Sequence, residues 1–352
     1  MNFYGELVRS LIIFALTFVV ALAWTPLLTH FLYKYKLGKR IRSSTEAPIM
    51  SQLHAKKAGT PTMGGVLIWL TVLVITLSLA GLATLWPESP LASLNFLSRA
   101  QTWLPLGALV ASAVVGLVDD FYNIRGKGAH GGGLRMRHRL LIYTAIALIG
   151  AFWFWYKLDW DVFALPFIQS ISIGWWYIPI FVGVIVATSF SVNETDGLDG
   201  LAGGTLMASF AAFGAIAFFE QRYELATFCA AISGALLAFL WFNIFPARFY
   251  MGDTGAMALG VTLGIVAMLT NAAWVLPIIG LVFVIESLSV IIQLSSKKLF
   301  HKKVFISSPI HHHLEAIGWP EPKIVMRLWI ISAVLAVLGV VLFLIEQGVQ
   351  GA

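Results

Sequence analysis

Ten long apolar runs divide this chain, and they constrain its fold more than any other feature. The sequence is 59% hydrophobic and only 11% charged, whereas soluble domains carry about 25% charged residues. The runs are continuous, as in membrane-spanning helices, and lack the alternation of a transmembrane β-barrel. We therefore predict an all-α polytopic membrane protein in which residues 1–352 form a single domain. The predicted transmembrane helices, about ten in number, cover residues 8–33, 64–84, 103–118, 139–156, 175–191, 201–219, 225–242, 255–270, 273–295 and 326–346.

The cations of the connecting loops predict the orientation of these helices. If the spans alternate in direction, nineteen of the 23 lysines and arginines fall in the loops of one side. The other side holds only Arg9, Arg99, Lys157 and Arg222. Because cytoplasmic loops carry the excess of positive charge, we expect the first side to be cytoplasmic and both termini to be periplasmic.

The segment from Asn193 to Gly204 is a short polar turn between two apolar runs. It holds three acids, one amide and four glycines in twelve positions. Asp196 and Asp199 are three residues apart, so a helical turn would place both on one face. Acidic side chains this close to hydrocarbon are costly and usually functional. We predict a ligand-binding turn; a solvated turn is the alternative.

Two adjacent acids, Asp119 and Asp120, stand at the cytoplasmic end of the third run. A helix C-terminus disfavours anions, so a compensating cation is expected. Neighbouring side chains on a helix diverge by about 100°, which predicts different roles for the two. A divalent metal and a proton transfer would fit; a solvated helix end, or one paired with Arg125, is the alternative.

Other cytoplasmic segments carry further polar groups. Lys57 precedes a Gly-Thr-Pro-Thr-Met-Gly-Gly segment that includes Thr62, a combination that favours an anionic ligand. Asn243 lies near the water boundary, where its amide can bridge polar groups. Asp253 precedes the eighth run, where it could also cap a helix. Tyr250 could stack on a base or lie in the interface.

Three consecutive histidines, His311, His312 and His313, lie in the last cytoplasmic loop. Zinc ligands need wider spacing, so these rings suit hydrogen bonding to phosphate or mutual orientation better. Glu286 lies inside the ninth apolar run. An acid at that depth is costly unless it faces a polar environment, and we expect it to be paired.

Four segments carry these acids, amides and histidines: residues 119–120, 193–199, 243–253 and 311–313. All four lie next to the same membrane boundary, which predicts a cleft on the cytoplasmic face. Carboxylate and amide oxygens suit Mg²⁺, which binds through carboxylates and substrate phosphates. A site between lipid and cytosol favours transfer from a water-soluble phosphate donor to a lipid acceptor. Phosphoryl transfer needs mainly alignment and charge neutralisation, which this set of residues supplies.

These segments resemble the polyprenyl-phosphate N-acetylhexosamine-1-phosphate transferase superfamily, and within it the phospho-N-acetylmuramoyl-pentapeptide transferase family. The Asp-Asp, Asn-x-x-Asp-Gly-Leu-Asp-Gly and Met-Gly-Asp segments resemble the superfamily at large. The triple-histidine segment and Gly-Thr-Pro-Thr-Met-Gly-Gly point to the narrower family. The matching segments are His54 to Gly65, Val118 to Asp120, Val192 to Leu201, Asn243, Pro246 to Ala247, Met251 to Gly255, Pro309 to Leu314 and Gly318 to Pro322.

The resemblance implies a Mg²⁺-dependent enzyme of a bacterial cytoplasmic membrane. It would transfer phospho-MurNAc-pentapeptide from UDP-MurNAc-pentapeptide to undecaprenyl phosphate, giving lipid I and UMP for peptidoglycan synthesis. Asp253 would bind the metal together with Asp196. Asp119 would be the base that deprotonates the lipid phosphate, with Asp120 in support.

The resemblance also implies a substrate pocket. Arg139 stands where the family usually has lysine, and Tyr250 where it usually has phenylalanine, so a cation and an aromatic face for uracil are kept. His311 to His313 would contact the phosphates or the sugar. The remaining residues implied to line the nucleoside and metal pocket are Asn193, Asp196, Asp199, Asn243, Lys57 and Thr62.

Two alternatives remain at this point. A sister transferase would use UDP-GlcNAc or another UDP-amino sugar; residues 308–322 argue against it. A lipid or ion transporter would carry ionisable groups near the bilayer midplane, where this chain has only Glu286. The bilayer and the two substrates are the expected partners, no nucleic acid is expected, and a homodimer is left open.

Overall fold

The computed structural model describes residues 2–38, 57, 59–99, 101–127, 133–166 and 170–350. Within them, nine helices are long and apolar enough to cross a membrane. They are α1 (Phe3–Lys34), α3 (Val66–Leu85), α4 (Trp103–Ile124), α5 (Met136–Lys157), α6 (Tyr177–Thr195), α7 (Leu201–Phe219), α8 (Tyr223–Asn243), α9 (Gly252–Leu269) and α13 (Glu321–Gln350).

The ninth predicted span, residues 273–295, is broken. Residues Ala273–Ile279, which contain η4 (Ala273–Val275) and α10 (Leu276–Ile279), meet α11 (Leu281–Phe300) at an angle of 80°. The prediction of one continuous helix over 273–295 was therefore wrong, because the helix ends at Gly280 and restarts in a new direction. The described residues thus contain nine to ten candidate spans, as predicted in number.

Short elements complete the fold. They are η2 (Pro90–Leu94), η3 (Gly174–Trp176), α12 (Ile310–Ala316), and the antiparallel strands β1 (Val162–Phe163) and β2 (Ile171–Ser172). Apart from these two-residue strands, in the loop between α5 and α6, and an isolated bridge between Gly38 and Pro61, the described residues form an all-α chain.

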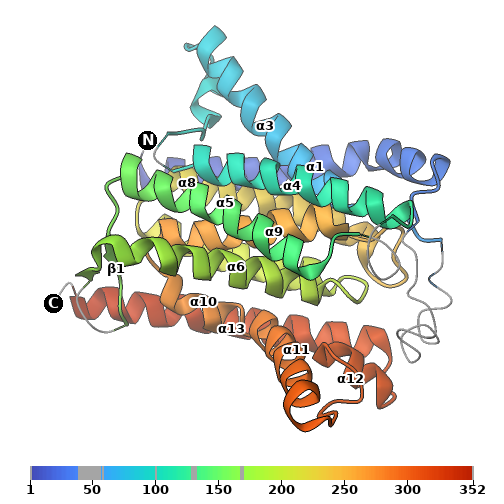
Figure 1. The fold of residues 1–352 in the computed structure, drawn as a ribbon. Coiled ribbons are helices and arrows are strands. Elements are labelled where there is room, and N and C mark those ends of the chain that lie inside the picture. The colour runs from blue at the N-terminus through green and yellow to red at the C-terminus, as the bar shows by residue number, and fades with distance from the viewer. Residues whose placement is uncertain are drawn as a thin grey trace.

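Helix α9 is the centre of the bundle, and every one of its residues is buried. It packs against α4 and α6, with further contacts to α3, α5 and α7 (Figure 1). Small residues allow membrane helices to approach closely. A Cβ on Gly116 of α4 would overlap the backbone of Asp253 and Thr254. This close approach brings the acids that follow Gly116 to the first turn of α9.

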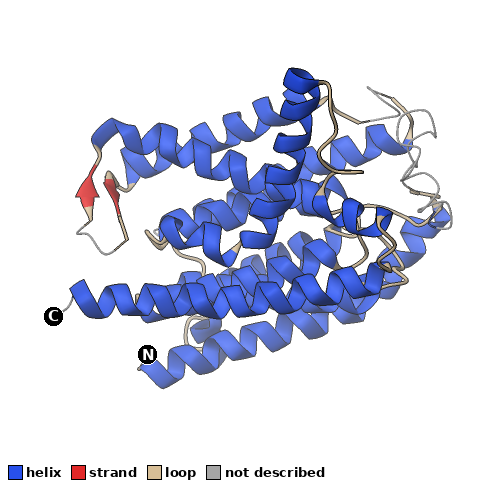
Figure 2. Ribbon diagram, turned by 90° about the horizontal axis from the view of Figure 1, so that it is seen from below, coloured by secondary structure: helices blue, strands red, loops and turns tan. Residues whose placement is uncertain are grey.

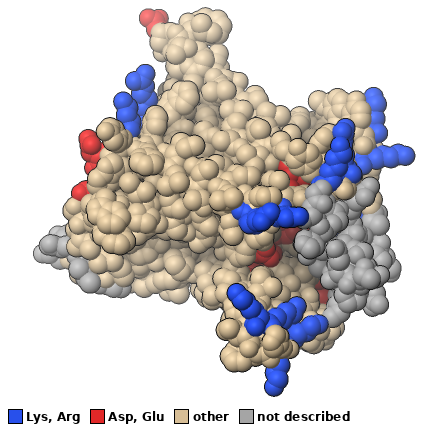
Figure 3. All heavy atoms as spheres, in the orientation of Figure 1, with Lys and Arg blue, Asp and Glu red and all other residues tan. Residues whose placement is uncertain are grey.

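Helix α1 begins and α13 ends at the same end of the bundle, as an even number of crossings requires (Figure 2). Helix α3, and α11 with α12, lean away from the other helices on opposite sides (Figure 1). Most of the lysine and arginine side chains visible in Figure 3 gather at the end opposite to the termini, with acidic atoms visible between them. The side of the membrane that this end faces stays a prediction.

Candidate active site

Asp120 holds the start of α9. Helix α4 continues to Ile124, past the predicted end at residue 118, so the two acids lie within the helix. Asp120 accepts hydrogen bonds from the backbone N–H of Asp253 (3.2 Å), the N–H of Thr254 (3.0 Å) and the hydroxyl of Thr62 (3.2 Å). A carboxylate at this position satisfies free N–H groups of the helix and interacts favourably with its dipole. Asp120 and Thr62 therefore orient the helix turn that carries Asp253.

Gly252 permits this arrangement. Its φ is +74°, a conformation that side chains rarely adopt, and an added Cβ would lie 2.5 Å from Thr62 Oγ1 and 2.6 Å from Asp120 Oδ2. Glycine is the residue that tolerates both the backbone conformation and the close approach. The Met-Gly-Asp sequence therefore serves to bring Asp253 beside the end of α4.

Asp119 points away from Asp120, as their adjacency predicted, and meets a cation. Its Oδ2 lies 2.6 Å from Arg139 Nη2, which also lies 2.8 Å from Asp253 Oδ2. Arg139 Nη1 donates to Asn193 Oδ1 (2.9 Å), and Asn193 Nδ2 donates to Asp253 Oδ1 (2.6 Å). We refer to Asp119, Arg139, Asn193 and Asp253 as the acid–arginine cluster. It joins α4, α5, α6 and α9, and its cation is Arg139 rather than Arg125, whose guanidinium lies over the Phe121 ring.

The donor atoms of this cluster suit Mg²⁺. Two carboxylates and an amide oxygen surround Arg139, and these are the hard oxygen ligands that Mg²⁺ prefers. The guanidinium lies between the two carboxylates, so a positive charge already has a place there. Among the described residues, no group of three or more His, Cys, Asp or Glu is arranged as a metal site. The fit to Mg²⁺ therefore rests on one or two carboxylates together with substrate oxygens.

Asp196 follows the last residue of α6 and precedes Gly197. The ion pairs described for Asp253 lead to Arg139, and through it to Asp119. The pairing of Asp196 with Asp253 on one metal ion stays a prediction.

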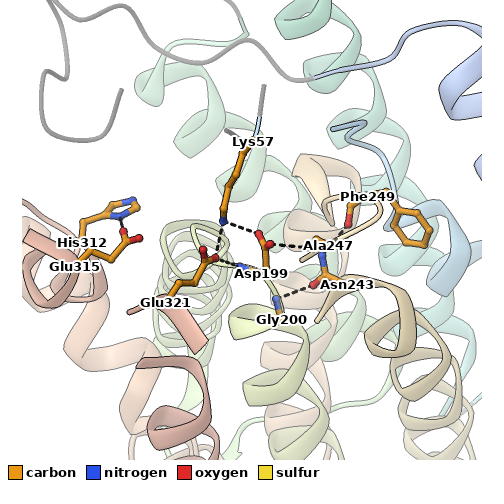
Figure 4. Close-up of polar contacts among 9 residues, drawn as sticks. All are labelled: Lys57, Asp199, Gly200, Asn243, Ala247, Phe249, His312, Glu315 and Glu321. Carbon is orange, nitrogen blue, oxygen red and sulfur yellow. Dashed lines mark hydrogen bonds and ion pairs between the residues drawn. The ribbon is translucent and has the colours of Figure 1, made fainter. Parts of the chain in front are cut away.

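A second set of charges surrounds Lys57, and we refer to Lys57, Asp199 and Glu321 as the Lys57 cluster (Figure 4). Lys57 Nζ lies 2.6 Å from Asp199 Oδ1 and 2.5 Å from Glu321 Oε1. Asp199 Oδ2 accepts from the N–H of Ala247 (3.0 Å), and the N–H of Asp199 donates to Glu321 Oε1 (2.7 Å). The cluster thereby joins the loop after α1, the turn before α7, the segment after α8 and the first residue of α13.

The pKa of Lys57 reflects these two acids. Burial by itself would lower the pKa of its ammonium group, but the charges of Glu321 and Asp199 outweigh burial and raise the pKa above its ordinary value of 10.5. The ammonium group lies 6.0 Å from the centre of the Tyr250 ring. Burial raises the pKa of the Tyr250 phenol, which keeps that group neutral at physiological pH.

Asn243 connects the segments around this cluster. Its Oδ1 accepts from the N–H of Gly200 (3.0 Å), and its Nδ2 donates to the carbonyl oxygen of Phe249 (2.8 Å) (Figure 4). The indole N–H of Trp329 donates to the carbonyl oxygen of Gly200 (3.0 Å). Asn243 thus uses both ends of its amide within the protein, where it fixes the turn that holds Asp199.

The three histidines are held individually by contacts to Nδ1. His311 Nδ1 lies 2.9 Å from Glu286 Oε2, and His312 Nδ1 lies 2.7 Å from Glu315 Oε2. His313 Nδ1 accepts from the N–H of Ile306 (3.3 Å). The prediction that Glu286 is paired is confirmed. Figure 4 places the His312–Glu315 pair to one side of the Lys57 cluster.

The segment from Asn193 to Asp199, which comprises the end of α6 and the turn that follows it, links all three groups of residues, and we refer to it as the Asn193–Asp199 turn. Asn193 belongs to the acid–arginine cluster, and Asp199 belongs to the Lys57 cluster. Between them, Gly197 packs against His311, because a Cβ on Gly197 would overlap His311 Nε2. The predicted gathering of distant polar segments is therefore present, with this turn at its centre.

Sequence reasoning missed two acids of this site. Glu315 is three residues after His312 on α12, a spacing that predicts contact on a helix and could have revealed it. Glu321 had no local signal, because its partner Lys57 lies in a distant loop. His54 to Lys56, which belong to a matching segment, lie outside the described residues.

A bundle of apolar helices whose acids, amides and cations meet at one end defines an integral membrane protein with a charged site at the end of its spans. The glycosyl transferase family 4 pattern matches residues 102–271. The phospho-N-acetylmuramoyl-pentapeptide-transferase signature 1 matches residues 57–68, which include Lys57 and Thr62.

Full-length relatives bear the same name. The chain is 39% identical to the phospho-N-acetylmuramoyl-pentapeptide-transferase of Chloroflexus aggregans over 97% of its own length and 91% of the relative. It is 39% identical to that of Geobacillus thermodenitrificans over 93% of its length and 95% of the relative. It is 39% identical to that of Shouchella clausii over 94% of its length and 96% of the relative. The chain belongs to the phospho-N-acetylmuramoyl-pentapeptide-transferase family.

Proposed function

We propose that this protein transfers phospho-MurNAc-pentapeptide from UDP-MurNAc-pentapeptide to undecaprenyl phosphate, forming lipid I and UMP. The observation that carries the proposal is the acid–arginine cluster, in which Arg139 bridges Asp119 and Asp253. Family membership supports the same reaction, since the relatives are named for it. The net change forms a bond between a phosphate oxygen of the lipid and the phosphorus that carries the sugar. The bond from that phosphorus to the oxygen of UMP breaks.

The charges of the cluster support a diphosphate site that requires a divalent cation. Asp119 and Asp253 with Arg139 have a formal charge of minus one, which by itself would repel a diphosphate. Mg²⁺, held by Asp253 with Asp196, would supply the missing positive charge and neutralise the phosphates. Arg139 presents a planar guanidinium suited to phosphate oxygens. Asp119 is assigned as the base that takes the proton of the lipid phosphate, because the guanidinium that would hold the phosphate oxygens also lies beside its carboxylate.

The Lys57 cluster supports a different task, the binding of the nucleoside. Its formal charge is also minus one, because two acids flank one ammonium group. A neutral base that offers carbonyl oxygens and a flat ring fits this environment better than a phosphate does. Lys57 and the Tyr250 ring are assigned to uracil, and Asn243 and Asp199 hold the backbone around it. His312 and His313 are assigned to the phosphates or the sugar.

The proposal includes a location. The protein would span the bacterial cytoplasmic membrane, with the clusters on the cytoplasmic face and both termini in the periplasm. The gathering of lysines and arginines at the end that holds the clusters supports this orientation.

Release of UMP tests the proposed function. Purified protein in lipid nanodiscs is supplied with UDP-MurNAc-pentapeptide, undecaprenyl phosphate and Mg²⁺, and UMP and the lipid product are measured. We expect UMP only when all three are present, and no UMP when UDP-GlcNAc replaces the donor. Release of UMP from UDP-GlcNAc at an equal rate would assign the protein to a sister activity. Absence of UMP with the complete set of substrates would refute the proposal.

A further inference from the structure

Glu286 is a fully buried acid in an otherwise apolar segment. It lies in the second turn of α11, after the break at Gly280, and its exposed fraction is 0%. Burial of a carboxylate away from water is unfavourable unless partners compensate. Its place in the chain therefore calls for a specific role that the proposed reaction does not yet give it.

The partner of Glu286 is His311, which is also fully buried. Glu286 Oε2 lies 2.9 Å from His311 Nδ1 and 3.4 Å from the backbone nitrogen of the same residue. A carboxylate next to an imidazole nitrogen accepts its N–H and so fixes both tautomer and ring orientation. A proton on His311 Nδ1 would satisfy Glu286 Oε2, and in this position the opposite edge of the ring is turned away from Glu286.

The opposite edge of the His311 ring faces the central turn of the site. Among the residues that the structure describes, neither His311 Nε2 nor Glu286 Oε1 has a hydrogen-bond partner, and both atoms are buried. A Cβ on Gly197 would overlap Nε2, so the ring edge lies directly against the Gly197 backbone. Buried polar atoms without a partner are unfavourable, so two of them are unexpected in a pair that serves packing alone.

His311 differs from its neighbours in where it is anchored. His312 is held by Glu315 of the same short helix, and His313 by the backbone of Ile306. Among the described residues, the ring of His311 is held by a side chain of α11, the helix that follows the break. The Glu286–His311 pair thus ties α11 to the turn that contributes Asn193 and Asp199.

We propose that Glu286 is a positioning residue that acts through His311. It holds the ring with Nδ1 protonated and with its Nε2 edge against Gly197, and thereby fixes the Asn193–Asp199 turn between the acid–arginine cluster and the Lys57 cluster. Its effect on turnover rests on the proposed function, whereas the state of the His311 ring does not.

Nitrogen-15 NMR of histidine-labelled full-length protein in lipid nanodiscs tests the ring directly. The His311 signal is assigned by its loss in His311→Asn. We expect the wild-type ring to be protonated at Nδ1. Glu286→Met, which keeps volume without an acceptor, should change the His311 signal, whereas Glu286→Gln, whose amide oxygen can still accept, should preserve it. The matched control Glu315→Met should change His312 and leave His311 unchanged.

Kinetics of UMP release test the consequence of this positioning. Glu286→Met should lower kcat by about tenfold or more, as loss of a residue that orients a histidine commonly does, and Glu286→Gln should restore most of it. The double variant Glu286→Met, His311→Asn should be no slower than the slower single variant, because both changes remove the same pair.

The outcomes separate this inference from the proposed function. A wild-type His311 that is neutral with its proton on Nε2 would overturn the inference even if Glu286→Met failed to fold. So would a His311 signal unchanged in Glu286→Met, or independent effects of the two substitutions on kcat. If the NMR results are as expected but the wild type releases no UMP, the pair stands and the proposed function fails.

Discussion

Arg139 Nη2 lies 2.8 Å from Asp253 Oδ2, and the same nitrogen lies 2.6 Å from Asp119 Oδ2. One guanidinium therefore binds two carboxylates that come from different helices. The three side chains are largely buried, at 16%, 9% and 0% exposure for Arg139, Asp253 and Asp119. Charges in such surroundings interact more strongly than on a surface, so each member should affect the others.

Arg139→Lys tests the guanidinium. Lysine keeps the charge but cannot donate to Asn193 and two carboxylates from one planar group. We expect kcat to fall by about tenfold to a hundredfold, the 1.4–2.8 kcal/mol that one or two such hydrogen bonds are worth. Arg125→Lys is the matched control, since Arg125 lies over Phe121. If Arg139→Lys were as active as the wild type, the claim that the Arg139 guanidinium contributes to the transfer would be wrong.

Asp119 and Asp120 should separate into a chemical and a structural role. Asp120→Ala removes the acceptor for two N–H groups of α9 and should lower the free energy of unfolding by about 1–3 kcal/mol. Asp119→Asn should stop UMP release with a much smaller change in thermal stability. Activity and melting temperature, measured on both variants, check this. The reverse pattern would show that the roles are exchanged.

The Lys57 cluster predicts a specific pH dependence of stability. The folded-state pKa of Lys57 is raised above 10.5, so its stabilising effect is fully present below that pH and is lost as pH rises through the folded-state value. The difference in melting temperature between wild type and Lys57→Met should stay constant from about pH 7 to 9 and shrink only at higher pH. A difference that disappears near neutral pH would show that Lys57 is not held by Asp199 and Glu321.

Gly197→Ala should displace the Asn193–Asp199 turn, which lies at the centre of the site. The new methyl group would overlap His311 Nε2 and force the turn or the ring to move, so we expect UMP release to fall by about tenfold or more. Gly183 lies in α6, the helix that leads into this turn. Gly183→Ala adds a methyl group with nothing within 4 Å and should leave UMP release unchanged. If both variants were fully active, close packing of His311 on the turn would be excluded.

The number of spans and most residues of the two clusters could be predicted from the sequence, for physical reasons. Continuous apolar runs determine transmembrane helices because lipid leaves few alternatives. Acids such as Asp119 and Asp253 stand out because the rest of the chain has so few charges. The break at Gly280 was missed because both halves are apolar. The pairing of Lys57 with Glu321 depends on how the last span packs, and no local pattern carries that information.

Asp253→Asn offers the most direct test of the claim that the acid–arginine cluster carries out the transfer. Asparagine keeps the shape of the side chain and removes the charge that would bind Mg²⁺ and pair with Arg139. UMP release with UDP-MurNAc-pentapeptide, undecaprenyl phosphate and Mg²⁺ is compared for wild type and variant, each confirmed as folded by its melting curve. We predict a loss of about a thousandfold or more, equivalent to at least about 4 kcal/mol of transition-state stabilisation. A variant that releases UMP at the wild-type rate would contradict this account.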